Sequence, residues 1–156
     1  ELSNTCLVLG GNISDCIMSV LGCEFAMMLL VIGSQESINN IISKLEETGD
    51  KLNLTLIAKE THPQESKQKR IPYLINVVSM DNPGIVHNIS DFLSSRNLNI
   101  EEIETKTYPA AHTGTTIFSL EMVISVSANS SVKILRDEFI TFCDDLNLDA
   151  SLESKR

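Results

Sequence analysis

A short turn beginning at Asp81 carries the residues whose types and spacing are best suited to chemistry. The sequence Asp-Asn-Pro-Gly occupies positions 81–84, and an apolar helical pattern starts immediately afterwards at Ile85. The first four backbone N–H groups of a helix have no partner within the helix, and together with the helix dipole they attract an anion. Gly84 lets a ligand approach the backbone closely, and Pro83 presets the first helical turn. The stretch therefore predicts an anion site at a helix start.

Two asparagines extend this candidate site. Asn99 follows the predicted helix at the start of the next extended segment, and its side-chain amide offers both a donor and an acceptor. A small zwitterion fits these groups, with its carboxylate on the helix amides and its ammonium on Asp81 or on the carbonyl oxygen of Asn99. The alternative is that Asp-Asn-Pro-Gly only caps the helix, and the sequence chemistry leaves both interpretations open. The candidate ligand-binding residues are Asp81, Asn82, Gly84, Ile85 and Asn99, with Asn12 as the counterpart of Asn99 in the first half of the chain.

In the second half of the chain, six predicted elements surround this turn. Period-two alternation and β-branched residues indicate strands, whereas apolar residues spaced at three and four indicate helices. The patterns predict a strand at 71–79, a helix from 85 to 93, an extended segment at 97–108, a strand at 118–126, a helix at 132–146 and a short strand within 146–153. This β-α-β-β-α-β order is typical of ferredoxin-like α+β domains, in which helices cover one face of an antiparallel sheet.

The first half of the chain repeats this pattern. Residues 25–60 align with residues 118–154, because both run from an apolar strand through a Ser- and Asn-rich break and an amphipathic helix to the sequence Asp-x-Leu-Asn-Leu. The segments before these strands also align, which places Asn12 beside Asn99. We therefore expect two domains of the same fold in tandem, at residues 1–61 and 71–156, joined by a polar linker at residues 62–70.

One helix has no counterpart in the first half. The runs at residues 5–9 and 52–56 are predicted to be the first and last strands of the first domain. Only two glycines separate the first of these strands from Asn12. Joining two parallel strands takes about a dozen residues or more, so about eighteen residues carrying the helix are expected to be absent between Leu9 and Gly10.

The composition limits the partners and cofactors of the chain. A net charge of −9 repels phosphates, so no direct binding to nucleic acid is expected. The longest apolar run, at residues 25–32, is too short to span a bilayer, and no membrane partner is expected. The four cysteines have no C-x-x-C spacing and the three histidines are scattered, so no metal site and no cofactor are expected.

The cysteines also indicate the cellular compartment in which the protein works. If Leu21 and Gly22 turn a hairpin, Cys16 faces Met27 and is out of register with Cys23, so a disulfide between them is not expected. Free thiols favour a cytoplasmic protein. Catalysis would need a nucleophile–base pair or a metal cluster. Neither can be assembled from these residues, and we expect no enzyme.

The tandem units, with the sequence DNPGIVHNISDFLSSRNLNIEE in the second one, resemble ACT domains, which are small regulatory modules that sense amino acids. The longer stretches NIEEIETKTYPAAHTGT and LRDEFITFCDDLNLDASLE narrow the resemblance to the glycine cleavage system transcriptional repressor family, over residues 5–60 and 71–153. The resemblance implies a repressor that contacts a LysR-type transcriptional activator protein, with a small amino acid, glycine first, as its signal. Of the residues that ACT domains use, Asp81, Gly84 and Asn99 match in the second repeat and Asn12 in the first.

The resemblance also implies assembly. ACT domains associate through helices or sheet edges, so we expect a homo-oligomer. A ligand-independent ACT module that serves only interaction or dimerisation is the alternative function, and a failure to respond to any amino acid would favour it.

Overall fold

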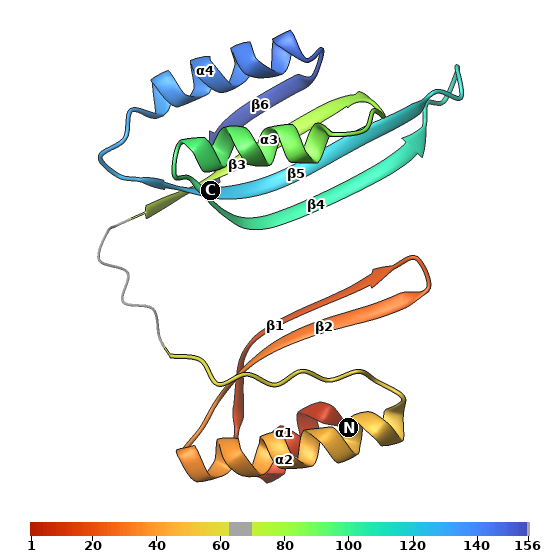
Figure 1. Cartoon of the computed structure of the whole chain (residues 1–156), viewed down its shortest axis with the longest axis vertical. Helices are drawn as coiled ribbons and strands as arrows, with labels where there is room; N and C mark the ends of the chain where they lie inside the picture. The colour runs from red at the N-terminus through yellow and green to blue at the C-terminus, as the bar shows by residue number, and fades with distance from the viewer. Residues whose placement is uncertain (63–69, 156) are drawn as a thin grey trace. The chain divides into compact units, whose positions relative to one another are not determined.

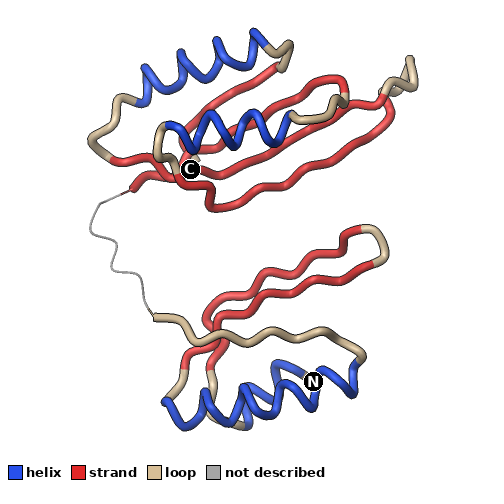
Figure 2. The backbone as a smooth tube through the Cα atoms, in the orientation of Figure 1, coloured by secondary structure: helices blue, strands red, loops and turns tan. Residues whose placement is uncertain are grey.

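The computed structural model describes residues 1–62 and 70–155. The chain divides into two compact units, Glu1–Pro63 (unit 1) and Gln64–Arg156 (unit 2). Figure 1 labels the helices and strands of each unit, and Figure 2 marks the loops between them. Most of the linker expected at residues 62–70 lies outside the described residues, and we keep 1–61 and 71–156 as the proposed domain boundaries.

Unit 2 has the predicted order of six elements. They are β3 (Arg70–Met80), α3 (Ile85–Ser95), β4 (Asn99–Pro109), β5 (Thr116–Ser127), α4 (Val132–Asp145) and β6 (Asp149–Ser154). The strands form one sheet in the order β4-β5-β3-β6, and every neighbouring pair is antiparallel. Both helices lie on one face of this sheet (Figure 1). The expected ferredoxin-like α+β fold is confirmed.

The core of unit 2 lies between the sheet and the two helices. Alternate side chains of β5 from Phe118 to Val126 belong to this core, as the period-two pattern of the sequence requires, and Val123 and Ser125 between them are also buried. The alternate side chains meet Ile89 and Leu93 of α3 and Phe139 and Cys143 of α4, all of which are completely buried. Burying a large apolar side chain stabilises a fold by about 1.5–3 kcal/mol, so this cluster supplies a rigid frame for the loops at both ends of the sheet. The β5 members are Phe118, Leu120, Met122, Ile124 and Val126.

Unit 1 contains two helices and a β-hairpin. Its elements are α1 (Leu2–Val8), β1 (Asn12–Leu21), β2 (Glu24–Ile32) and α2 (Gln35–Leu52). The two strands pair antiparallel and form a sheet of their own. The side chain of Ser34 caps α2 by accepting the N–H of Ser37 at 3.1 Å. The hairpin turns one residue later than expected, so Cys16 faces Leu29 instead of Met27, and all four cysteines are free.

The strand expected at residues 5–9 is wrong, because these residues belong to the helix α1 and the turn that follows it. A run of four apolar residues after Thr5 does not distinguish a strand from a buried helical turn by periodicity alone. Only Cys6 of this helix is fully buried, whereas Leu7 and Val8 are each 72% exposed. The burial of one residue per turn is the signature of a helix.

The end of α1 repeats the end of α3. The N–H of Gly11 donates to the carbonyl of Cys6 at 2.8 Å, as the N–H of Leu98 donates to the carbonyl of Leu93 at 3.0 Å. The residue before each donor is left-handed, with φ of 81° and 55° respectively. Each helix therefore ends in the same six-residue hydrogen-bonded closure.

The hairpin of unit 1 also repeats its counterpart residue by residue. Asn12 pairs with Ile32 as Asn99 pairs with Ser125, and both ladders shift register after the second pair. Helix α1 is therefore the counterpart of α3, and no helix is missing between Leu9 and Gly10. What unit 1 lacks, among the described residues, are counterparts of β3 and β6.

The closing strand expected at residues 52–56 is also wrong. Helix α2 continues to Leu52, Asn53 is left-handed with φ of 54°, and residues 54–62 form no strand. In unit 2 the corresponding strand β6 pairs with β3 alone. Because unit 1 has no counterpart of β3 in the described residues, the segment after α2 has strand-like sequence but no strand to pair with.

Candidate functional site

The loop at residues 81–84 joins the end of β3 to the start of α3, and all four of its residues are exposed. The backbone N–H of Asp81 donates to the carbonyl of Thr116 at 3.0 Å, which ties the loop to the first residue of β5. The side-chain amide of Asn82 donates back to the carbonyl of Met80 at 3.3 Å. Gly84 has φ of 94°, a conformation that favours glycine. The structure therefore has a tight turn with a left-handed glycine at the start of α3, where the sequence predicts a turn.

The loop does not cap α3 with a side chain. Gly84 is the N-cap residue, and no side-chain hydrogen bond caps the helix, so the carboxylate of Asp81 does not serve this purpose. Helix α4 also starts without a side-chain cap, so an uncapped start is not by itself a binding site. In α3 the uncapped start is combined with a glycine and a nearby exposed carboxylate. The side chain of Ile85 is buried, so only its backbone faces the loop.

Asn99 lies in a different polar cluster, at the start of β4. Its side-chain amide donates to the carboxylate of Glu101 at 3.2 Å. Hydrogen bonds from the Ser125 hydroxyl and from Asn99 lower the pKa of Glu101, with a smaller contribution from the charge of Arg70. The guanidinium of Arg70 in turn donates to the Ser125 hydroxyl at 3.4 Å. The Asn99 carbonyl oxygen and the ionised Glu101 carboxylate suit a cation better than an anion.

The structure does not bring Asn99 and the 81–84 loop together within unit 2. Asn99 pairs with Ser125, which pairs with Pro72 near the start of β3, whereas Met80 ends that strand. Eight residues of extended strand span about 26 Å. One small zwitterion therefore cannot contact both ends of the same sheet. The expected arrangement of the two groups around a single ligand in one unit is corrected accordingly.

Asn12 holds the same position in unit 1 that Asn99 holds in unit 2. It is exposed at the start of β1 and pairs across the hairpin with Ile32. Unit 1 has no counterpart of the 81–84 loop in the described residues, because Glu1 corresponds to Asn88 when α1 is aligned on α3. Of the six candidate residues, Asp81, Asn82, Gly84 and Ile85 are brought together, and the two asparagines lie elsewhere.

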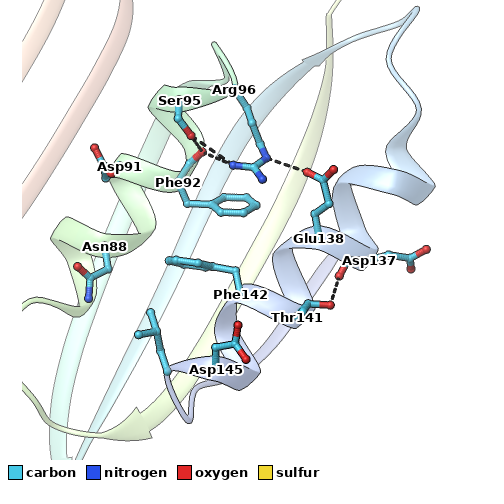
Figure 3. Close-up of a pocket in the computed structure, with 11 residues that line it drawn as sticks. Asn88, Asp91, Phe92, Ser95, Arg96, Asp137, Glu138, Thr141, Phe142 and Asp145 are labelled. Atoms are coloured by element: carbon cyan, nitrogen blue, oxygen red, sulfur yellow. Dashed lines mark hydrogen bonds and ion pairs between the residues drawn. The ribbon is translucent and has the colours of Figure 1, made fainter.

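A groove between α3 and α4, about 890 Å³ in volume, was not predicted from the sequence (Figure 3). The rings of Phe92 and Phe142 stack across it with centroids 4.7 Å apart. Asn88 lines the end of the groove, and its amide nitrogen would lie 3.9 Å from a Cβ placed on Gly84. The only sequence signal was the position of Asn88, four residues or one helical turn after Gly84. Both phenylalanines fit the apolar spacing of their helices, and only Phe142 is half-buried, since Phe92 is buried.

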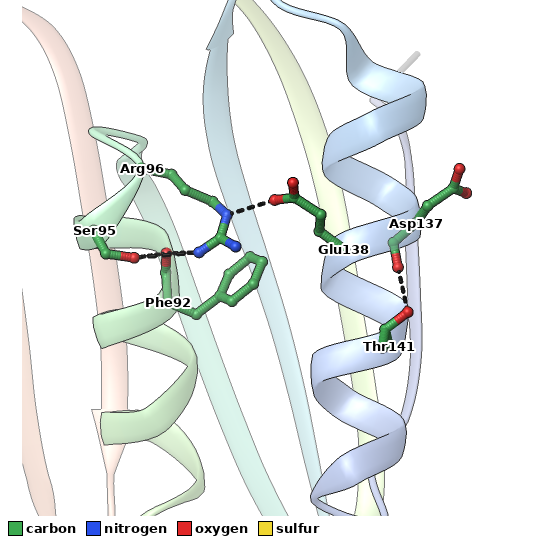
Figure 4. A network of polar contacts seen from close by, with 6 residues as sticks. All are labelled: Phe92, Ser95, Arg96, Asp137, Glu138 and Thr141. Atoms are coloured by element: carbon green, nitrogen blue, oxygen red, sulfur yellow. Dashed lines mark hydrogen bonds and ion pairs between the residues drawn. The ribbon is translucent and has the colours of Figure 1, made fainter.

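Arg96 closes the other end of this groove. Its guanidinium lies 3.7 Å from the centroid of the Phe92 ring and donates to the carboxylate of Glu138 at 2.9 Å. It also donates to the Phe92 carbonyl at 3.3 Å and to the Ser95 hydroxyl at 3.2 Å (Figure 4). Both members of the ion pair are well exposed, so the pair contributes at most about 1 kcal/mol. Its main effect is to hold α3 and α4 in register.

Within residues 1–62 and 70–155, no group of three or more His, Cys, Asp or Glu side chains is arranged to hold a metal ion. No helix in these residues is both long and apolar enough to cross a membrane.

Known proteins resemble this chain along nearly all of its length. No family model matches it. The glycine cleavage system transcriptional repressors of Escherichia coli (strain K12) and Shigella flexneri are each 24% identical to it over 143 residues, which cover 92% of this chain and 75% of each relative. A crystal structure provisionally named for the same repressor has a TM-score of 0.75 and 21% identity over 99% of this chain and 87% of that chain. The resemblance seen in the sequence is thereby confirmed.

Proposed function

We propose that this chain is a non-enzymatic, amino-acid-responsive regulatory protein that represses the genes of glycine cleavage. The proposal is supported by the name that its two sequence relatives share over 92% of the chain. Because a net charge of −9 disfavours direct contact with DNA, the repressor would act by binding a DNA-binding activator protein of the LysR type in the cytoplasm.

The signal would be a small amino acid, glycine first, bound at the 81–84 loop. The observation that carries this proposal is the left-handed Gly84, which starts an uncapped helix three residues after an exposed carboxylate. The amides of α3 would bind the ligand carboxylate. The ligand would be small because the carboxylate of Asp81 lies in the four-residue loop directly before those amides.

A second copy of the chain would complete the binding site for the ammonium group of the ligand. Asn99 and Glu101 form a cluster suited to a cation, but it lies about 26 Å from the loop of the same unit. Two copies related by a twofold axis, packed side by side in opposite directions, bring the loop of each beside the Asn99 cluster of the other. This arrangement makes ligand binding and homo-oligomer formation depend on each other. Asn12 is the corresponding residue of unit 1.

A second function is favoured by the internal hydrogen bonds of the same residues. The amide of Asn82 is already used by Met80, and the amide of Asn99 by Glu101. Side chains that are satisfied within the unit do not need a ligand. A ligand-independent interaction module would have the same fold and the same exposed loop.

A thermal-shift titration with glycine, serine, alanine and larger amino acids separates the two functions. A ligand bound only by the folded state stabilises it by roughly 2.7 kcal/mol at a hundred times its Kd. Each kcal/mol raises the midpoint of a domain of this size by about 4–8 °C. We expect a glycine-selective rise that is lost in Asp81→Ala and Asn99→Ala and kept in Asp149→Ala, a matched removal of an exposed carboxylate at the far edge of the sheet. A flat response to every amino acid would instead establish the interaction module.

The proposed repression through an activator protein has a separate test. Mobility-shift assays with a glycine-cleavage promoter should show no complex with this chain alone and a slower complex when the activator is also present. A shift produced by this chain alone would contradict action through a protein partner.

A further inference from the structure

The groove between α3 and α4 of unit 2 has an apolar floor. The stacked rings of Phe92 on α3 and Phe142 on α4 form this floor, and Leu146, which is 39% exposed, continues it past the end of α4. Phe92 also contacts the core through Phe139, whose ring centroid lies 5.5 Å away. The floor is therefore fixed in place, while half-buried Phe142 and exposed Leu146 leave part of it open to water.

Carboxylates line both walls of this groove. Asp91 lies on α3, Asp137, Glu138 and Asp145 lie on α4, and all four residues are exposed. Arg96 is the one basic residue that lines the groove, and it is paired with Glu138. Among the described residues, no Lys or Arg forms an ion pair with the other three carboxylates. The groove therefore has an excess of negative charge on both walls.

Arg96 shows which kind of side chain the groove accepts. Its guanidinium lies 3.7 Å from the centroid of the Phe92 ring and donates to the carboxylate of Glu138 (Figure 4). An aromatic ring and a carboxylate thus hold a cation at this end. The opposite end has the same two groups in Phe142 and Asp145, which are three residues apart on α4 and so lie on one face of the helix. Asp145 has no ion pair with a described cation.

We propose that this groove binds an amphipathic helix of a protein partner, with Lys or Arg on both sides of an apolar ridge. The apolar ridge would pack on Phe142 and Leu146. The flanking cations would pair with Asp91 on one wall and with Asp145 on the other. Helix α4 has 14 residues and is therefore about 21 Å long, so a partner helix of about four turns spans the groove.

Charge favours this occupant over two others. In a twofold contact between two copies of the chain, the groove would face itself and its carboxylates would oppose each other, which costs binding energy. Phosphate groups of a nucleic acid are repelled for the same reason. A basic helix is attracted, and proteins that bind DNA carry basic segments. The inference rests on the proposed function, because it names the surface and the chemistry through which the DNA-binding partner would be held.

Fluorescence anisotropy with the full chain tests the proposal. The probe is a dye-labelled synthetic peptide of about four helical turns, made of Lys and Leu, with Leu at alternating spacings of three and four residues. The control peptide has the same composition in an order that gives no apolar face. The probe should bind, its affinity should fall as salt is added, and the control should have a Kd about tenfold higher or more.

Two double variants with the same change in net charge locate the site. Asp91→Asn combined with Asp145→Asn removes one carboxylate from each wall. It should raise the Kd of the probe about tenfold, since one exposed ion pair changes affinity by about two- to fivefold. Asp149→Asn combined with Glu153→Gln removes two exposed carboxylates of β6 that do not line the groove. This control should leave the Kd within about twofold, because salt screens distant charges.

A third variant fills the groove and keeps all of its carboxylates. Thr141 lines the groove and is exposed on α4, so Thr141→Arg adds a bulky cation where the partner helix would lie. This variant should not bind the probe. Thr141→Ser keeps a hydroxyl that can donate to the carbonyl of Asp137, as Thr141 does at 2.9 Å, and should bind like the parent. Circular dichroism checks that every variant is folded.

Three results with the probe would overturn the proposal: equal binding of the two peptides, equal weakening by the two double variants, or a homodimer of the parent chain that Thr141→Arg dissociates. The last result would mean that a second copy occupies the groove. The mobility-shift assay separates this inference from the proposed function. A slower activator complex that Thr141→Arg leaves unchanged would contradict the groove alone. No activator complex, together with the expected probe binding, would contradict repression and support the groove.

Discussion

Replacing Gly11 by alanine should loosen the contact between α1 and α2. Gly11 is buried where α1 turns into β1, and a Cβ there would lie 2.5 Å from the Cδ1 atom of Ile41 and 2.9 Å from Cγ1 of Val31. It would also lie 3.2 Å from the carbonyl oxygen of Cys6, which is fixed by the hydrogen bond that closes α1. Overpacking of this kind typically costs about 1–3 kcal/mol.

The thiol of Cys6 provides a local assay that does not depend on unit 2. Cys6 is 1% exposed, and burial raises its pKa, so alkylation requires α1 to open. A loss of 1–3 kcal/mol raises the open fraction roughly 5- to 150-fold. The rate of Cys6 alkylation, measured by peptide mass spectrometry at a pH near neutrality, should rise by the same factor.

Two controls identify the cause of this change. Gly33→Ala places a Cβ at ordinary contact distances of 3.4 Å and should leave the Cys6 rate within a few-fold of the parent. Ile41→Val removes the Cδ1 atom that clashes, so Gly11→Ala should cost less in that background than in the parent. An unchanged Cys6 rate in Gly11→Ala, or an equal cost in both backgrounds, would refute the placement of α1 against α2.

Three other predictions concern unit 2 and the thiols. Phe139→Ala empties a completely buried site and should lower the free energy of unfolding of unit 2 by about 3–5 kcal/mol in urea, so a loss below 1 kcal/mol would contradict its place in the core. Iodoacetamide should modify the exposed Cys16 and Cys23 quickly and the buried Cys143 only after unfolding, as counted by intact mass. Burial, helped by the charge of Asp144, raises the pKa of Cys143 to about 12 from an unfolded value of 9.0. Because the unfolded thiol loses its proton first, the stability of unit 2 should fall as pH rises from 9 towards 12, and Cys143→Ala should flatten this part of the profile.

The elements of unit 2 could be predicted from the sequence because each one combines a clear period with distinctive ends. The alternation of Phe118, Leu120 and Met122 marks a strand with one buried face, and the Asp-Asn-Pro-Gly turn marks the start of α3. The repeat itself was also predictable, since Asn53 and Asn147 end equivalent helices in the same left-handed conformation. These features depend on residues that are close together in the sequence, so the sequence alone is enough to predict them.

The errors in unit 1 arose where pairing partners decide the structure. The apolar residues 6–9 fit a strand or a short helix, and only their contact with α2 and Gly11 selects the helix. Residues 54–56 have the sequence of a closing strand, but a strand needs a neighbour to accept its hydrogen bonds. The expected gap after Leu9 followed from the first of these errors.

The residues of the candidate site stay a prediction, and their arrangement in space could not be read from the sequence. The turn at Asp81 to Gly84 depends on local backbone chemistry, so its place before a helix could be expected from the sequence. The distance between Asn99 and the loop depends on the parallel course of β3 and β4, which places the starts of both strands at the same end of the sheet. Asn88 and Arg96 were missed because a groove between two helices has no signature in either helix alone.

Glycine binding by mixed variants tests most directly whether the loop of one copy and Asn99 of another form the site. Gly84→Ala, which strains the left-handed start of α3, and Asn99→Ala should each abolish binding in equilibrium dialysis while both proteins remain folded. After an equimolar mixture of the two variants has exchanged subunits, about one quarter of the sites should again be intact, because half of the dimers are mixed and each mixed dimer holds one unaltered site. Recovery near this fraction is the result that a shared amino-acid site predicts. Full binding by Asn99→Ala alone, or no binding of glycine by the unaltered protein, would contradict it.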